Sequence, residues 1–467
     1  MTDRTEALAA ATRRITLHRL IWRWHFYAGL FCVPFVLILA ITGTIYLFKP
    51  QVEAALDAPY AHLKLTGPAA SPESQALAAV GSLPGGRLKA YQLPTTPDQA
   101  TQVIVKAGGQ DMRVYLNPQT LQVLKSVPEK ARFMAIDHDL HGELLMGENG
   151  SILVELAGSW ALVMVLTGLY LWWPREAQGL AGVLYPRLWG GGRLFWRDLH
   201  AVTGIWISGL ALFLLLTALP WTQVWGQGFK ALRTATAPRA APADWATAGA
   251  AAPDDPHADH QGMGGMTGMK GMGGHHHIMR GDYAALNQIV PQAARMNLAY
   301  PALVSPPGKQ GRKASVNWTA KSDAQNRPLR QEITFDAQGR LLSRQTFADK
   351  PLVDRVVAVG VAAHEGQLFG WANQLLGLTA ALGMITLSVS GLIMWWKRRP
   401  EGRLGAPAIL DDRRLSWGLG LLVLAFAVFL PVLGVSLVAV ALIEQLVLRW
   451  TPGVRTWLGL RTVQATR

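Results

Sequence analysis

The sequence contains a single cysteine, Cys32, and this scarcity excludes several kinds of site. One thiol cannot form an intrachain disulfide, and it cannot supply the thiolates of a structural zinc site or an iron–sulfur cluster. There is also no Cys-x-x-Cys-His stretch, so a covalently attached haem is excluded. Cys32 lies inside an apolar run, where we expect a small buried side chain.

Charged residues are scarce as well, at 16% of 467 residues, whereas 50% are hydrophobic. This balance is too apolar for one soluble domain. The net charge of +14 does not indicate nucleic-acid binding, because the basic residues flank apolar runs, where they set membrane topology. Many of the 18 Trp residues flank the same runs, as is typical at the headgroup level of a bilayer. We therefore predict a membrane protein that binds lipid and no nucleic acid.

Four segments are long enough to cross a bilayer, which takes about 20 apolar residues. The positive-inside rule places the basic N-terminus and two short connections in the cytoplasm, and two long loops in the periplasm. In chain order the predicted regions are the N-terminus 1–22, span 23–48, loop 49–150, span 151–173, connection 174–197, span 198–220, loop 221–372, span 373–396 and connection 397–416.

The C-terminal part allows two interpretations. Residues 417–448 are almost all apolar but contain Pro431 and Gly434. They form either a fifth, kinked crossing helix or a re-entrant hairpin, followed by an amphipathic tail at 449–467. We favour one crossing helix, although it places the basic tail outside, against the charge rule.

The two long loops are predicted to be separate small α+β modules. In each, two short strands flank a turn, at 113–123 and at 332–342. Residues 234–280 interrupt the second module with a flexible insertion rich in Ala, Pro and Gly and then in Met and His. The expected fold is thus an all-α membrane bundle with two periplasmic modules.

The two halves of the membrane region repeat one pattern. His25 and His200 each begin a span and are followed four residues later by a glycine. His141 and His364 are each followed six residues later by a glycine and 31 residues later by a tryptophan. Two helix pairs of equal direction imply a pseudo-two-fold axis along the membrane normal. Such an axis would bring His25 to His200 near the cytoplasmic face, and His141 to His364 near the outer face.

Two facing imidazoles are a natural axial pair for a haem iron. Gly29 and Gly204 leave room for a flat ligand or a closely packed helix. Arg23, Arg193 and Arg197 are candidates to pair with the propionates of haem. In the alternative interpretation, a duplicated structural motif keeps each histidine as a packing residue.

His138 leaves the identity of one ligand open, because it lies three residues before His141 and on the same face of a helix. It could replace His141 as ligand or contact a substrate. Asp137, Asp139 and Glu143 could orient an imidazole through its second nitrogen, as carboxylates commonly do beside ligand histidines.

These paired features resemble the PepSY-associated transmembrane-helix family, over roughly residues 15–400. The matching stretches are 23–29, 137–147, 168–175, 197–204, 364–370 and 391–398. Within that family the chain looks most like iron-regulated membrane proteins and ferric-siderophore reductases of Gram-negative bacteria. The resemblance implies an inner-membrane protein with two b-type haems, PepSY modules in the periplasm, and reduction of a ferric siderophore there. It implies His25, His200, His141 and His364 as the haem ligands.

The insertion departs from the simpler family pattern and suggests a second metal. Thioethers and imidazoles in a glycine-rich setting suit copper, although a polar linker of biased composition is an equal alternative. The candidate ligands are His257, His260, Met263, Met266, Met269, Met272, His275, His276 and His277. If they bind metal, the substrate could be copper rather than a ferric siderophore.

Two further questions stay open. No flavin or nicotinamide fingerprint is present, so the electron donor is a quinol or a separate reductase. The rival function is a membrane-tethered periplasmic module that binds metal or regulates a protease and carries out no redox chemistry.

Overall fold

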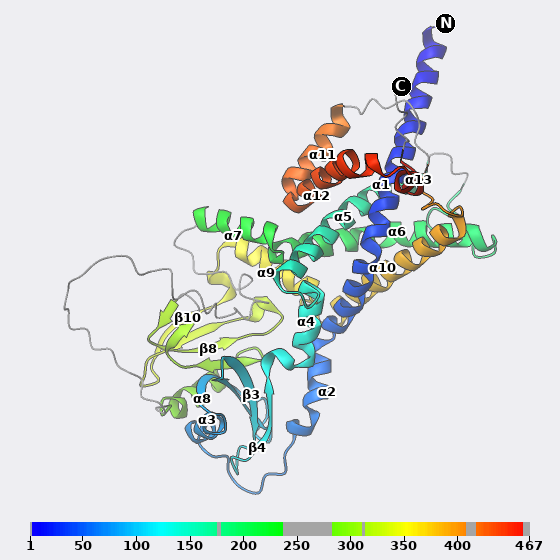
Figure 1. Ribbon diagram of the computed structural model, residues 1–467. Helices are drawn as coiled ribbons and strands as arrows, with labels where there is room; N and C mark the ends of the chain where they lie inside the picture. The colour runs from blue at the N-terminus through cyan, green and yellow to red at the C-terminus, as the bar shows by residue number, and fades with distance from the viewer. Residues whose placement is uncertain (1, 175–178, 237–282, 311–312, 408–416, 461–467) are drawn as a thin grey trace, which may run out of the picture. The chain divides into compact units, whose positions relative to one another are not determined.

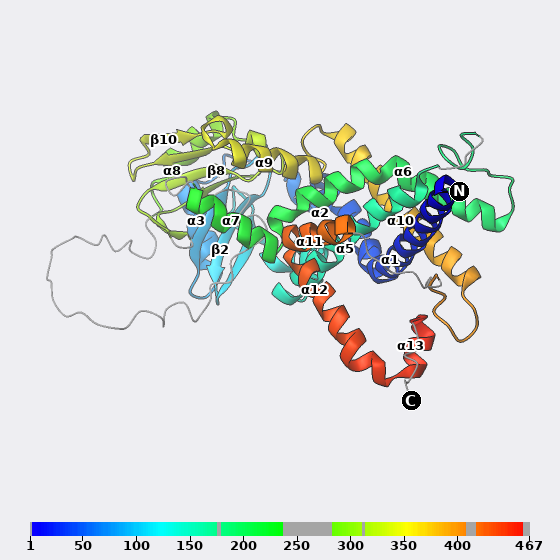
Figure 2. The ribbon, with the colours of Figure 1, turned by 90° about the horizontal axis from the view of Figure 1, so that it is seen from above.

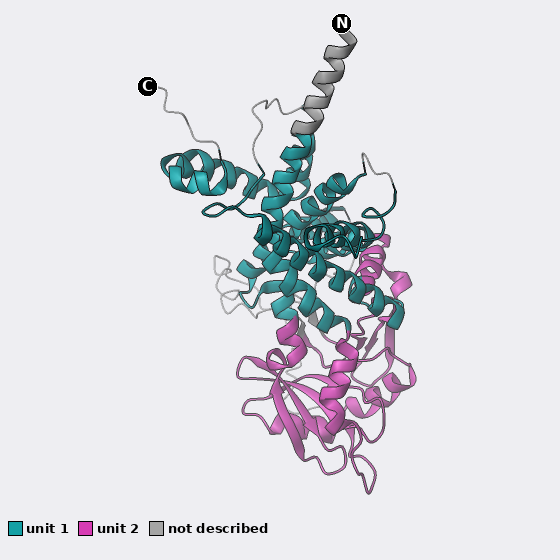
Figure 3. Ribbon diagram, turned by 90° about the vertical axis from the view of Figure 1, so that its right-hand side faces the viewer, with its two compact units in different colours: residues 1–47, 138–240, 364–467 teal, residues 48–137, 241–363 magenta. Residues whose placement is uncertain are grey.

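The computed structural model describes residues 2–174, 179–236, 283–310, 313–407 and 417–460. The chain divides into two compact units, one of which is helical and the other built around a sheet (Figure 3). The helical unit contains residues 1–47, 138–240 and 364–467, and the sheet unit contains residues 48–137 and 241–363. The expected Met/His-rich insertion lies outside the described residues from residue 237 onward.

Four long helices form the centre of the helical unit (Figures 1 and 2). They are α1 (Thr2–Leu47), α5 (Glu148–Trp172), α6 (Gly192–Ala218) and α10 (Trp371–Arg398). Helix α1 packs against α5 and α10, and α6 packs against the same two helices, so the four close into a ring. Helices α1 and α6 therefore face each other diagonally, an arrangement that places side chains from facing helices in one bundle core.

Five helical segments among the described residues are long and apolar enough to cross a membrane: Leu17–Leu47, Glu148–Trp172, Gly192–Trp221, Trp371–Arg398 and Pro431–Trp450. The first four lie within a few residues of the predicted spans. Since each is longer than the roughly 20 residues that a bilayer requires, the prediction of a helical membrane bundle is confirmed.

The C-terminal region is not one kinked helix. It contains α11 (Trp417–Phe429) and α12 (Pro431–Leu442), which are separated at Leu430, whose backbone is not helical (φ −118°, ψ 85°). A β-carbon at Gly434 would lie 2.8 Å from the carbonyl oxygen of Ala427, seven residues earlier. A continuous helix separates such residues by about 10 Å, so the chain turns sharply here and residues 417–448 are two helices, the second of which begins a segment, Pro431–Trp450, that is itself long and apolar enough to cross a membrane. Pro431 starts the new helix, where its missing N–H costs nothing.

The described residues also form several shorter helices. They include α4 (Phe133–Glu143), α7 (Val224–Thr236), α9 (Leu352–His364) and α13 (Pro452–Leu458). The start of α7 is held by Glu155, a buried acid in α5 that sequence analysis did not single out. Its carboxylate accepts hydrogen bonds from the backbone N–H groups of Val224, at 2.7 Å, and Trp225, at 3.0 Å. These are two of the N–H groups that a helix N-terminus leaves without an internal partner.

The sheet unit contains two successive sets of one helix and four main strands. The first set is α3 (Pro72–Gly81), β1 (Arg87–Gln92), β2 (Thr101–Ala107), β3 (Gln110–Leu116) and β4 (Val123–Pro128). The second is α8 (Leu286–Arg295), β5 (Ala302–Ser305), β8 (Trp318–Ser322), β9 (Glu332–Phe335) and β10 (Leu341–Gln345). Helix α2 (Lys49–Ala61) and the small hairpin of β6 (Gly308–Gln310) and β7 (Lys313–Ser315) also belong to this unit. Both predicted turns join antiparallel strands, β3 to β4 and β9 to β10.

The two sets do not form separate modules, and the prediction is corrected on this point. Strand β1 pairs with β5 through Tyr91 opposite Val304, which gives one sheet of order β10-β9-β8-β5-β1-β2-β3-β4. One apolar core under this sheet includes Leu286 and Ile289 of α8 together with Ala76 and Ala79 of α3. Pairing β1 with β5 satisfies the backbone groups of two strand edges that separate modules would leave exposed.

Candidate functional site

His25 of α1 and His200 of α6 lie opposite each other in the bundle. Their ring centres are 6.4 Å apart, and the ring planes meet at 87°. Both side chains are half-buried. The structure thus brings together the first predicted histidine pair, from helices that are diagonal in the bundle.

Each of these two rings is held through Nδ1 by a neighbouring helix, in the same way. Nδ1 of His25 is 3.1 Å from the carbonyl oxygen of Met164 and 3.1 Å from Oγ1 of Thr167, both in α5. Nδ1 of His200 is 3.1 Å from the carbonyl oxygen of Leu387 and 3.1 Å from Oγ of Ser390, both in α10.

The second pair is held by hydroxyl groups as well. Nδ1 of His141 is 2.9 Å from Oγ1 of Thr42 in α1, and Nδ1 of His364 is 2.9 Å from Oγ1 of Thr217 in α6. Burial, together with the neighbouring His364 and His138, lowers the pKa of His141 to about 3. Burial lowers the pKa of His364 to about 4. Both imidazoles are therefore neutral at ordinary pH.

The hydrogen bonds fix the tautomer of these rings. Carbonyl oxygens accept only, so Nδ1 of His25 and of His200 must be the donor. The hydroxyls of Thr42 and Thr217 lie 2.8 Å and 2.7 Å from carbonyl oxygens one turn earlier, those of Ile38 and Phe213, to which each donates its single proton. They therefore accept from the histidines. With the proton on Nδ1, each Nε2 keeps its lone pair, which is the form that binds a metal.

Glycines permit the close approach of the rings at several points. A β-carbon at Gly168 would lie 3.2 Å from Cε1 of His25, and one at Gly43 would lie 3.1 Å from Cε1 of His141. The corresponding distance from Gly391 to His200 is 3.5 Å. At Gly29 and Gly204, the added atom would meet only ordinary contacts, at 3.6 Å and 3.7 Å. Close helix packing therefore does not explain the glycines that the sequence singled out at 29 and 204.

The glycines six residues after His141 and His364 have a backbone role. Gly147 precedes α5 with φ 61° and ψ −139°, and Gly370 precedes α10 with φ 60° and ψ −139°. This conformation is strained for any residue with a β-carbon. The same unusual turn thus leads from each histidine into the next long helix.

His138 occupies a different position from His141. Its Nδ1 is 3.3 Å from Oδ1 of the adjacent Asp139, and its ring centre is 5.7 Å from that of Tyr46. It has no bond to Thr42, and the residue that corresponds to it before His364 is Val361. The contacts that recur between the two halves therefore involve His141.

Two arginines proposed as anion partners are engaged elsewhere. Arg23 is buried and donates to the carbonyl oxygens of Pro407, at 2.8 Å, and Gly459, at 3.0 Å. Arg197 pairs at 2.7 Å with Asp198, a fully buried acid that sequence analysis missed.

Sequence analysis also missed the hydroxyls that hold the histidines, although their spacing was visible. Thr42 and Thr217 each lie 17 residues after the histidine that begins their helix, His25 and His200. Thr167 and Ser390 each lie 26 residues after His141 and His364. Hydroxyl residues are common in such helices, so their equal spacing does not stand out beside that of the histidines, glycines and tryptophans.

No group of three or more His, Cys, Asp or Glu side chains suited to a metal ion occurs in the part of the chain that the structure describes. The nine Met and His candidates of the insertion lie outside that part.

The fold and the site together define a membrane protein with a helical bundle, one pair of facing histidines, two further histidines bonded to hydroxyl groups of the bundle, and an antiparallel sheet outside the candidate spans. Residues 22–398 match the family described as PepSY-associated TM region, and the chain belongs to this family. No curated protein matches the sequence significantly.

Proposed function

We propose that this protein carries electrons across a bacterial inner membrane through two b-type haems. One would be held by His25 and His200 near the cytoplasmic face, the other by His141 and His364 near the periplasmic face. Electrons would enter from a quinol or a cytoplasmic reductase and leave to a ferric siderophore, or to another metal complex such as copper, in the periplasm. In this proposal the two helix pairs are internal repeats about an axis along the membrane normal.

The observation that carries the proposal is that all four histidines make the same kind of hydrogen bond. Each Nδ1 is held by a hydroxyl group, and the proton of each ring is on that nitrogen. A packing histidine needs hydrogen-bond partners, but it does not need a free Nε2 in four equivalent places. Oriented, neutral imidazole with Nδ1 donating is the usual state of a histidine that ligates a metal.

The spacing of the first pair fits an iron between the rings. An atom bonded to both Nε2 atoms at about 2 Å would separate the ring centres by roughly 6 Å, since each centre lies about 1 Å beyond its nitrogen. The structure has 6.4 Å between the centres of His25 and His200.

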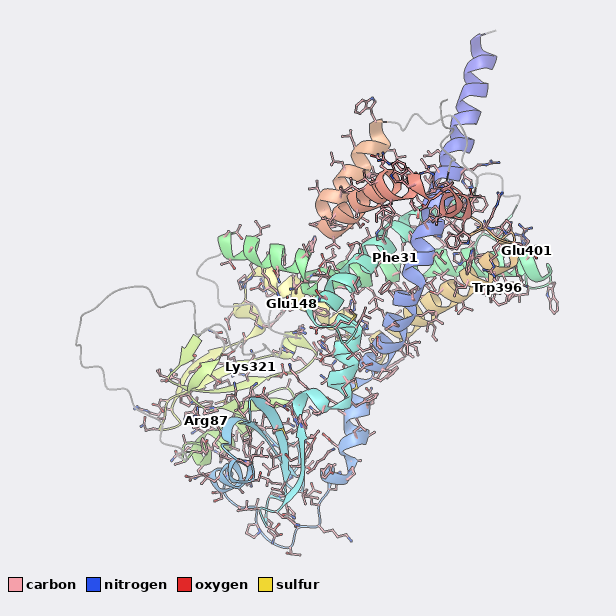
Figure 4. The ribbon with its side chains drawn as sticks, in the orientation of Figure 1. Phe31, Arg87, Glu148, Lys321, Trp396 and Glu401 are labelled. Carbon is pink, nitrogen blue, oxygen red and sulfur yellow. The ribbon has the colours of Figure 1, made fainter. Side chains whose placement is uncertain are left out.

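The distance along the bundle between the two proposed haem sites is also comparable to the thickness of a membrane. Thr42, which holds His141, follows His25 by 17 residues of one helix, or about 25 Å along its axis. That rise is close to the roughly 30 Å thickness of a bilayer's hydrocarbon core. Figure 4 shows the corresponding ends of the bundle well apart, with Glu148 at the start of α5 and Trp396 near the end of α10.

Haem, when bound, supplies reversible one-electron chemistry at its iron. The residues of the chain position it: the histidines as ligands, the hydroxyls and carbonyls as their supports, and the apolar helices as the surroundings that exclude water. No side chain is required as acid or base.

The test is an absorption spectrum of the purified protein with haem quantitation. We expect a reducible Soret band and two haems per chain. His25→Ala or His200→Ala should remove one haem, and His141→Ala or His364→Ala the other. His138→Ala is the matched control and should retain both.

A protein made with ample haem that shows no reducible Soret band would overturn the proposal. In that case, loss of biological function on deletion of the sheet unit, with no effect of His25→Ala, would favour the rival tethered module without redox activity.

A further inference from the structure

Two arginines lie together where α6 begins and α10 ends. The helix ends are adjacent, because a β-carbon at Gly192 would lie 3.7 Å from Nζ of Lys397. Arg193 is exposed, whereas Arg398 is half-buried. The guanidinium carbon of Arg398 is 4.9 Å from the ring centre of Trp22 and 5.6 Å from that of Phe26, both in α1.

Neither arginine has a carboxylate partner among the residues that the structure describes. Arg398 donates to the carbonyl oxygen of Gly405 at 3.2 Å, and Arg193 lies close enough for the two positive charges to repel each other. By contrast, Arg187 and Arg197 both bind the carboxylate of Asp198. Two like charges beside apolar helices are costly unless an anion binds between them.

The position of this pair follows from the helices that carry it. Arg193 precedes His200 by seven residues, and Arg398 follows Gly391 by seven. Seven residues make two turns of a helix. Arg193 therefore lies on the same face of α6 as His200, and Arg398 on the same face of α10 as Gly391, each about 10 Å away along the axis. Gly391 is the glycine that faces the His200 ring.

The aromatic contacts place Arg398 close to the other histidine as well. Trp22 lies three residues before His25 and Phe26 one residue after it. The guanidinium of Arg398 thus lies beside the turn of α1 that contains His25. Both arginines therefore lie near the end of the bundle that contains the His25 and His200 pair.

We propose that Arg193 and Arg398 bind the two propionates of the haem held by His25 and His200. This inference rests on the proposed function. The propionates leave one edge of the macrocycle and end in carboxylates, which a guanidinium binds with paired N–H donors. They would take the place of Arg23 and Arg197, whose guanidinium groups already have partners. The phosphate of an anionic lipid is the other anion of suitable chemistry, and the test separates the two.

The test compares Arg193→Gln, Arg398→Gln and the double variant with Arg399→Gln. Arg399 is the matched control, because it follows Arg398 directly but stacks on Trp396, 4.0 Å from the ring centre. The readouts are the rate of haem transfer to apomyoglobin and the midpoint potential of the haem that His25→Ala removes. Protein made without haem is loaded with haem or with haem dimethyl ester, which lacks both carboxylates.

With haem, we expect each glutamine variant to release it about tenfold faster, as for loss of one charge-assisted hydrogen bond. The midpoint potential should fall, because a positive charge that stabilises the reduced haem is lost. Arg398→Lys should keep most of the potential. With the dimethyl ester, wild type and variants should release the ligand at the same rate.

The proposal is overturned if Arg193→Gln and Arg398→Gln behave like Arg399→Gln. It is equally overturned if the variants differ from wild type with the dimethyl ester, since the arginines would then act on lipid phosphate or on packing. Failure of the proposed function is recognised separately: wild type itself would then show no haem that depends on His25, and this inference would fall with it.

Discussion

Removing the hydroxyl that holds His141 should weaken one haem and leave the other unchanged. Thr42→Val keeps the shape of the side chain and deletes the acceptor that lies 2.9 Å from Nδ1 of His141. The N–H of the ligand then loses its partner, and the ring loses its fixed orientation. Loss of such a support typically costs about 10- to 100-fold in metal affinity, or about 1.4 to 2.8 kcal/mol. Thr217→Val should weaken binding of the same haem to a similar extent, because Thr217 holds His364.

The assay is haem release, followed separately for the two haems that the histidine variants distinguish. Thr44→Val is the control, because the Thr44 hydroxyl also donates to a carbonyl oxygen one turn earlier, at 2.7 Å, but holds no histidine. Thr167→Val should produce the complementary pattern and weaken only the haem of His25 and His200. Equal release rates for Thr42→Val and Thr44→Val would refute the reasoning that the hydroxyl prepares the ligand.

Three further predictions concern stability. Burial alone would raise the pKa of the Glu129 carboxyl, but the neighbouring Arg113 guanidinium outweighs burial and holds this pKa below 4.5. The ion pair should therefore stabilise β3 and β4 fully above about pH 4.5, and this stabilisation should disappear as the pH falls. Hydrogen exchange of these strands measures the effect, and Glu129→Gln should show no such pH dependence. Glu155→Leu should expose the N–H groups at the start of α7 and speed their exchange, and unchanged exchange there would contradict the assigned role. Gly147→Ala should cost about 1–3 kcal/mol in thermal unfolding, whereas Gly142→Ala, in open helical space, should not destabilise the protein.

The sequence predicted features that depend on local patterns. The candidate spans follow from hydrophobic length, and the turns at Asn117 and Asp336 follow from side chains that accept nearby backbone N–H groups. The proximity of His25 and His200 followed from symmetry, without any knowledge of the contacts.

What the sequence did not predict depends on contacts between distant segments. Pairing of β1 with β5 joins strands more than 200 residues apart, and no local signal selects which strand edge meets which. Pro431 indicated an irregularity in this apolar segment, but whether a proline kinks a helix or ends it depends on the packing around it. Arg23 was read as an anion partner because its carbonyl acceptors, Pro407 and Gly459, lie in segments far along the chain.

The two histidine pairs differ in what can displace them. His25 and His200 lie within candidate spans, whereas His141 and His364 lie on α4 and α9, two helices that themselves cross from one unit into the other. A helix transmits tilt along its length, so a ligand that reorders the sheet unit should move the second pair and leave the first in place. We therefore expect a metal complex that binds the sheet unit to shift the spectrum of the haem lost in His364→Ala, and not that of the haem lost in His25→Ala. Titration of the reduced protein with a redox-inert gallium analogue of a ferric siderophore measures this. Equal shifts at both haems would show that the two pairs are not separated in this way.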